Sequence, residues 1–243
     1  MMRRILLLSA VISWASPTYA QSNHVYAVPY TSELIAIDGH QGLPWNHASW
    51  STYFTDIVTG ESAQHNTNFK ALWDDENLYF YFRLLGGDLE ASGNVDHEPL
   101  FSFDNVIEIF LDPGADQKEY YELQINTKGT RWELLLDKPY KDGGVATSPY
   151  ELEGLEYDIY LEGTLNQSED SDKYWTVELK IPWNSIPGVT SVPPADNFKV
   201  NFSRVHQDDD DIETPPQYWL WTPMGKFDIH IPERWGSLIF IKK

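Results

Sequence analysis

Short runs of β-branched and aromatic residues recur along the chain, with turn residues between them, and no segment sustains a long helical period. Such runs are typical of strands. The clearest is a hairpin of residues 69–73 and 78–85, joined by a turn from Asp74 to Asn77. Further strands are predicted over 106–111, 120–126, 131–136, 155–165, 175–183, 198–205 and 238–242, and one short helix over 44–54. The pattern predicts an all-β fold, an antiparallel β-sandwich of two packed sheets, jelly-roll or immunoglobulin-like.

Alternation within these strands separates an apolar face from a polar one, because successive side chains point to opposite sides of a sheet. In residues 120–126, for example, Tyr121, Leu123 and Ile125 form the apolar face. The polar positions of three predicted strands are Glu108, Glu122, Gln124, Asn126, Asn201 and Ser203. If they adjoin in one sheet, their carboxylates and amides can bond several sugar hydroxyls at once. The alternative is a sheet face that is merely solvated.

Aromatic residues make up 14% of the chain, with ten Trp and fourteen Tyr. These side chains stack on sugar rings, but they also fill the cores of sandwiches. Alternation predicts that Trp73, Trp175 and Trp183 are buried. Trp219 and Trp221 lie on one side of a strand-like segment after a proline-rich loop, so they are candidates for an exposed ligand-binding platform, with a core position as the alternative.

The first twenty residues are typical of a secretory signal, with Arg3 and Arg4, an apolar stretch over 5–14 and small residues up to Ala20. We expect cleavage after Ala20 and a single domain over 21–243, exported to the periplasm or beyond the cell as a monomer. The apolar stretch is too interrupted for membrane insertion. The chain has no cysteine and a formal net charge of −20, which repels nucleic acid and anionic lipid.

Most familiar catalytic motifs are missing: there is no Gly-x-Ser-x-Gly, no His-Glu-x-x-His and no cysteine. No catalytic residue is therefore assigned. A glycoside hydrolase that uses Glu108 and Glu122 as acid and base stays open as an alternative.

Acidic residues gather on both sides of the predicted strand 106–111, and Ca²⁺ prefers several oxygen ligands. Asp88, Asp96 and Asp104 precede this strand, while Asp112, Asp116 and Glu119 follow it. Neither spacing matches an EF-hand loop. The candidate ligands for a structural calcium ion are Asp88, Asp104, Asp112 and Asp116, with solvated loop acids as the alternative.

Seven segments occur in the order seen in family 9 carbohydrate-binding modules. They are Ile-Asp-Gly at 37–39, Leu-Trp-Asp-Asp at 72–75 with Leu-Tyr at 78–79, the run 104–113, the run 120–126, 175–178 with 181–183, 201–204, and Pro-Glu-Arg-Trp-Gly at 232–236. The chain thus resembles this family over nearly all of residues 21–243. The resemblance implies a sugar-binding β-sandwich, often an accessory module of xylan-degrading enzymes, in which known members carry calcium.

The family's binding residues match this chain only in part. The resemblance implies that Glu108 bonds sugar hydroxyls, whereas Gln124 stands where an arginine is expected. Two clamping tryptophans are missing from 100–103 and 228–231. Phe101, Phe103 and His230 are the candidate replacements.

Three functions remain in competition at this point. The first is a non-catalytic carbohydrate-binding protein that recognises a plant or algal polysaccharide, or its oligosaccharides, in carbohydrate catabolism. The second is the hydrolase described above, and the third is an interaction module that has lost its sugar site. A groove with exposed rings around Glu108 favours the first, while a face plugged by side chains favours the third.

Overall fold

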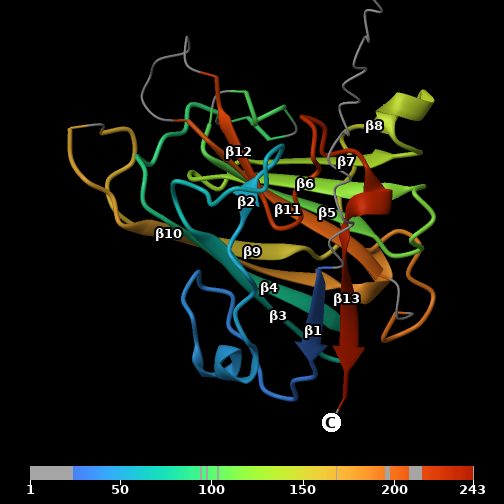
Figure 1. The fold of residues 1–243 in the computed structure, drawn as a ribbon. Coiled ribbons are helices and arrows are strands. Elements are labelled where there is room, and N and C mark those ends of the chain that lie inside the picture. Colours follow the sequence, from blue (N-terminus) through green and yellow to red (C-terminus); the bar gives the residue numbers. More distant parts are fainter. Residues whose placement is uncertain are drawn as a thin grey trace, which may run out of the picture.

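Two stacked β-sheets and short connecting segments form the computed structural model, which describes residues 24–93, 95–96, 98–102, 104–167, 169–194, 198–207 and 215–242 (Figure 1). The predicted signal, residues 1–20, lies outside the described residues. The described helices are short 3-10 turns at Leu43–His47, Tyr140–Asp142, Trp183–Ser185 and Pro232–Arg234. None of these described helices is long or apolar enough to cross a membrane.

The larger sheet has nine strands and the smaller sheet four. The larger one runs in the order β1 (Val25–Pro29), β13 (Gly236–Ile241), β11 (Phe198–His206), β5 (Val106–Asp112), β6 (Tyr120–Asn126), β7 (Arg131–Leu136) and β8 (Ala146–Thr147), and β12 (Gln217–Leu220) joins β11 to β2 (Thr55–Asp56). The smaller one runs in the order β3 (Thr67–Trp73), β4 (Asn77–Leu85), β10 (Tyr174–Pro182) and β9 (Glu156–Glu162). The predicted all-β sandwich is confirmed, with β1 and β13 as a parallel pair while the other paired strands named above are antiparallel.

The β3–β4 hairpin forms where the sequence predicts it. Asp74 accepts backbone hydrogen bonds from Glu76 and Asn77 at 2.8 and 2.6 Å, so its side chain closes the turn. Trp73 and Leu78 are paired in the ladder directly behind this turn. A short polar side chain that bonds its own backbone therefore sets the register of the smaller sheet.

The predicted helix over 44–54 is wrong. Only Leu43–His47 forms a 3-10 turn, and the chain then becomes extended. The reason is that the backbone N–H groups of Ser51 and Phe54 donate to the carbonyls of Phe69 and Thr67 at 2.8 and 3.0 Å. Pairing with the edge of β3 thus replaces the intrahelical bonds that these groups would otherwise need.

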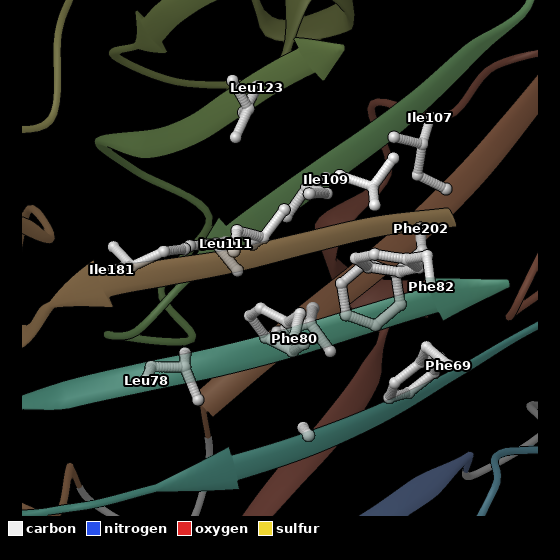
Figure 2. Close-up of a cluster of buried hydrophobic side chains, with 14 of the residues drawn as sticks. Phe69, Leu78, Phe80, Phe82, Ile107, Ile109, Leu111, Leu123, Ile181 and Phe202 are labelled. Atoms are coloured by element: carbon white, nitrogen blue, oxygen red, sulfur yellow. The ribbon is translucent and has the colours of Figure 1, made fainter. Parts of the chain in front are cut away.

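The main core lies between the two sheets, where aromatic and aliphatic side chains from both meet (Figure 2). Phe202 of β11 lies 4.5 Å, ring centre to ring centre, from Phe69 of β3 and 5.1 Å from Phe82 of β4. Burying each such ring stabilises the fold by roughly 1.5–3 kcal/mol. The tryptophans predicted to be buried, Trp73, Trp175 and Trp183, belong to this core.

The opposite face of the larger sheet is also covered. An apolar cluster there, called the outer cluster below, combines sheet residues with loops that fold over them: Ile57, Phe110, Tyr120, Leu134, Leu136, Leu220, Met224, Ile231 and Trp235. Trp235 packs on Phe110 and Tyr120 at 5.5 and 5.2 Å. Beside the outer cluster, the polar side chains of β5 and β6 remain on the same face.

Candidate functional site

The polar positions of three strands adjoin on this outer face, as the alternation predicts. Ser203 of β11 is paired with Glu108 of β5, and Glu108 is paired with Gln124 of β6. Glu122, two residues before Gln124, points to the same side of the sheet. Glu108 and Glu122 are each only 4% exposed. The face is therefore buried rather than merely solvated.

Gln124 holds the two carboxyl groups together. Its Nε2 donates to Glu122 at 2.8 Å and to Glu108 at 3.1 Å. Its Oε1 accepts the backbone N–H of Leu100 at 3.3 Å, which fixes the orientation of the amide. Glu108 Oε2 is buried and has no hydrogen-bond partner among the described residues. Both acids therefore share one neutral donor.

Burial raises the pKa of both glutamates above the usual carboxyl range. For Glu108 the charge of Glu122 raises the pKa further, because two carboxylates this close disfavour each other's ionised form. Tyr218 is affected as well: burial first, and then the charge of Glu108, raise its pKa to about 12. The site thus has a strongly negative potential whenever both glutamates are ionised.

The glutamates lie at the floor of a cavity of about 140 Å³. Its lining is Ile57, Phe101, Glu108, Glu122, Gln124, Tyr218, Phe227, Asp228, Ile229 and His230. Liquid water occupies about 30 Å³ per molecule, so the cavity has room for roughly five waters. Aromatic rings around a floor of hydrogen-bonding groups are typical of small-ligand sites.

His230, one of the predicted replacements for a clamping tryptophan, lines the cavity but is anchored from behind. Its Nδ1 and the Tyr120 hydroxyl are 3.0 Å apart, and its Nε2 lies 3.9 Å from Glu122. Burial lowers the pKa of His230 to about 4, against a smaller opposing effect of Asp228. The imidazole is therefore neutral near pH 7 and gives the glutamates no positive charge.

The other aromatic residues predicted to bind ligand lie in different places. Phe101 lines the cavity, whereas Phe103 lies outside the described residues. Trp219 and Trp221 are only 3% and 2% exposed and belong to the main core, so the expectation of an exposed platform is wrong for both. For Trp219 the reason is the register of β12, which pairs it with the inward-pointing Arg204. Trp221 lies beyond β12 and packs against Phe69 and Phe202.

Tyr218 and Phe227 are the site residues that sequence reasoning missed. Tyr218 alternates with Trp219 along β12, so the burial of Trp219 turns Tyr218 to the outer face, opposite Val205. Alternation could have revealed Tyr218. Phe227 lies in a loop and is 68% exposed, with its ring 5.0 Å from that of Tyr218 in an edge-on contact. Loop residues carry no periodic signal, and Phe227 therefore could not be predicted.

Asn126, predicted to bind ligand, instead organises a loop. Its Nδ2 donates to Gly93 and Asp104 at 3.0 and 2.7 Å, and its Oδ1 accepts the N–H groups of Lys128 and Thr130. The residue is fully buried and does not line the cavity. Its polar groups are all used within the protein.

The four candidate metal ligands lie in two places. Asp88 and Asp104 precede β5, while Asp112 ends it and Asp116 follows. The Asp104 carboxylate already accepts bonds from Ser92, Gly93 and Asn126. No group of three or more acids or histidines within the described ranges could hold a metal ion.

The turn after β5 has a carboxylate oxygen that no hydrogen bond from the described residues occupies, unlike those of Asp104. Asp112 is fully buried, and its Oδ1 has no hydrogen-bond partner within the described ranges. Burial raises the pKa of Asp112 above the usual carboxyl range. The charge of Asp116, which lies on the same turn, adds a smaller effect in the same direction. A Cβ placed on Gly114 would lie 3.4 Å from Asp116 Oδ1 and 3.9 Å from Asp112 Oδ1. The two oxygens thus border one small space.

The cavity can accept hydrogen bonds from a polar ligand and hold its apolar edge against rings. Both carboxyl groups lie side by side on adjacent strands and share one amide. A glycosidase instead places its acid and its base or nucleophile on either side of the scissile bond. The arrangement therefore suits binding better than hydrolysis.

Comparison with known proteins agrees with the two-sheet fold. The family model described as "Carbohydrate family 9 binding domain-like" matches residues 37–243. None of the curated protein sequences matches the chain. A family 9 module from Caldicellulosiruptor kristjanssonii in complex with cellotriose is 17% identical, with 90% of this chain and 94% of that chain covered and a TM-score of 0.62. Its complex with glucose gives 17% identity, coverage of 90% and 96%, and a TM-score of 0.60. A protein from Bacteroides uniformis is 18% identical over 90% of this chain and 100% of that chain, with a TM-score of 0.66.

Proposed function

Because the chain belongs to the family 9-like carbohydrate-binding domains, we propose that it is an exported, non-catalytic protein that binds a plant or algal polysaccharide or its oligosaccharides. The observation that carries the proposal is the cavity over Glu108, Glu122 and Gln124 with aromatic side chains at its rim. Carboxylates accept hydrogen bonds from sugar hydroxyls, and rings pack on the C–H faces of sugars.

The shape of the site supports recognition of a chain end. The outer cluster and its loops cover much of the sheet face and leave a small cavity of about 140 Å³ over the glutamates, which suits one terminal residue better than an extended chain. An interaction module would be favoured if side chains filled the whole face. Around Glu108 there is a cavity instead. Glu108 Oε2, buried without a partner in the described part of the chain, gives a ligand hydroxyl an acceptor.

A glycan-array screen of the purified protein, followed by titration of the best ligand, tests the proposal. Glu108→Ala should weaken that ligand at least tenfold, since a hydrogen bond to a charged group is worth about 1.5–3 kcal/mol. Glu156→Ala is the matched control, because Glu156 is an exposed acid of β9 in the other sheet. Silence of the folded protein across plant, algal and bacterial glycans would contradict the proposal and favour the interaction module.

A hydrolase that uses the two glutamates is the second candidate, favoured by their shared cavity and raised pKa values. It predicts that Glu108→Gln abolishes turnover of the best ligand while affinity is kept. Incubation of that ligand with the wild-type protein, followed by chromatography for shorter products, distinguishes it from the binding protein. Intact ligand after long incubation supports the non-catalytic function.

We also propose a structural calcium ion at one turn of the protein. Asp112 and Asp116 would hold Ca²⁺ at the turn after β5, because Asp112 Oδ1 is buried and without a partner in the described ranges. The ion would supply structural stability there. Thermal unfolding with Ca²⁺ and with chelator should differ by several degrees in the wild type, and Asp112→Asn should remove the difference. Equal midpoints would exclude this site.

A further inference from the structure

The cavity contains acids and no cationic side chain. Of its lining residues within the described chain, three are acidic (Glu108, Glu122 and Asp228) and none is lysine or arginine. Asp228 is paired with Lys226 at 3.3 Å, so its charge is compensated locally. The two glutamates have no such partner in the described ranges, because His230 is neutral. When the glutamates are ionised, a ligand in this cavity therefore meets an uncompensated negative charge.

The protein also provides few hydrogen-bond donors to the two glutamates. Ionised carboxyl groups offer about four lone-pair sites each, yet the Gln124 amide is shared between both. Ser203, paired with Glu108 across the ladder, adds only one hydroxyl beside Glu108, which lowers the pKa of that carboxyl slightly against the larger effect of burial. The floor is thus built for a group that brings several N–H or O–H donors at once. An ammonium group brings three.

Charge decides between an ammonium and a hydroxyl. When both glutamates are ionised, a hydroxyl can donate one bond to a carboxylate, but it leaves the repulsion between Glu108 and Glu122 in place. A cation between them turns two unfavourable interactions into favourable ones, and in a buried site this effect is larger than in water. The net charge of −20 also concentrates cations near the protein.

The rim suits a sugar ring that carries such a group. Tyr218 and Phe227 meet edge-on at 5.0 Å, and Phe101 lines the cavity with them. Rings of this kind bind both C–H faces and cations. Because Phe227 is 68% exposed, it remains available to a ligand that projects from the cavity.

We propose that the cavity recognises the terminal residue of an amino sugar, a hexosamine whose free amino group is protonated, with the ammonium on Glu108 and Glu122 and the ring against Tyr218 and Phe227. This inference rests on the proposed carbohydrate-binding function and names its ligand class. An N-acetylated sugar lacks the charge, and its acyl group meets the same acids without compensating them.

Calorimetric titration of the full protein with three trisaccharides tests the inference. The probes are fully deacetylated glucosamine trisaccharide, its N-acetylated counterpart, and neutral cellotriose, at low salt and pH 7, because at lower pH the raised pKa values leave both glutamates protonated. The deacetylated sugar should bind at least tenfold more tightly than either of the others. Glu108→Gln and Glu122→Gln should each remove most of this preference, whereas Glu156→Gln, which deletes an exposed acid of the other sheet, should leave it unchanged.

The outcomes distinguish amino-sugar recognition from carbohydrate binding in general. Equal or tighter binding of cellotriose, lost in Glu108→Gln, would overturn the amino-sugar inference while supporting carbohydrate binding. No binding of any sugar in the glycan screen or in these titrations would overturn both. Competition by cyclohexylammonium as strong as by the amino sugar would assign the cavity to amines in general and overturn the sugar specificity. A preference that Glu156→Gln reduces as much as Glu108→Gln would reduce it to general attraction by net charge.

Discussion

The two faces of the larger sheet are equally buried around β5 and β6, but they are built from opposite chemistry. On the inner face, Ile107, Ile109 and Leu123 pack into the main core. On the outer face, Glu108 and Gln124 occupy the alternate positions of the same strands. Apolar burial stabilises the fold, whereas burial of unpaired charge opposes it. We infer that the inner face holds the sandwich together and that the outer face is retained for binding.

The largest effect should come from breaking the inner face. Phe202→Ala should lower the free energy of unfolding by about 3–5 kcal/mol, since it leaves a cavity among Phe69, Phe80 and Phe82. The neighbouring Ser203→Ala is the matched control on the outer face. Because this change removes one small hydroxyl and leaves no large cavity, it should change stability by no more than about 1 kcal/mol. Urea unfolding of both variants measures the contrast, and similar losses would contradict it.

The second effect has the opposite sign and depends on pH. Burial raises the pKa to about 8 for Glu108, aided by the charge of Glu122, and to about 7 for Glu122. In the unfolded chain both lose their protons near pH 4.5, so the native state binds more protons between these values and the wild type loses stability as pH rises through them. Glu122→Gln should therefore be more stable than the wild type by about 1–3 kcal/mol at pH 8, and by much less at pH 5.

Unfolding curves of both proteins at pH 5 and pH 8 check this sign. The lowered pKa of His230 makes an opposite contribution, since its unfolded form binds a proton that the native form does not. Both proteins retain His230, Asp228, Tyr120 and Tyr218, so their difference isolates the glutamates. A Glu122→Gln variant less stable than the wild type at pH 8 would show that the carboxyl pair is not a strain on the fold.

The sequence predicted both faces because alternation with period two is a direct consequence of strand geometry. The strand of residues 131–136 appears with the expected bounds, and Glu108 and Gln124 adjoin as expected. Loops were harder to predict, since their course depends on contacts distant in sequence. The extended segment through Ser51 is held by β3, and Phe227 reaches the site only because residues 222–235 fold over the outer cluster. No local pattern records either contact.

A third change should compensate the negative charge of the two glutamates on the outer face. Gln124→Arg places a permanent cation between Glu108 and Glu122, at the position where the family resemblance implies an arginine. The protein then supplies the charge that we assign to the ligand. The preference for deacetylated over neutral trisaccharide should fall about tenfold, equal to about 1.4 kcal/mol. Calorimetry of Gln124→Arg beside Gln124→Glu, which adds no cation, measures this, and an unchanged preference in the arginine variant would contradict the amino-sugar inference.

The smallest effect should come from the rim of the cavity. Phe227 is 68% exposed and contacts Tyr218 edge-on, so Phe227→Ala should change stability by less than about 0.5 kcal/mol. Loss of one stacking ring should weaken the bound sugar about threefold, close to the lower end of what an exposed ring contributes. Phe227→Tyr should keep both values, because the ring remains. Equal affinities of the alanine variant and the wild type would mean that the ligand is held by the floor alone, and the contribution of the outer face to binding would then reduce to Glu108, Glu122 and Gln124.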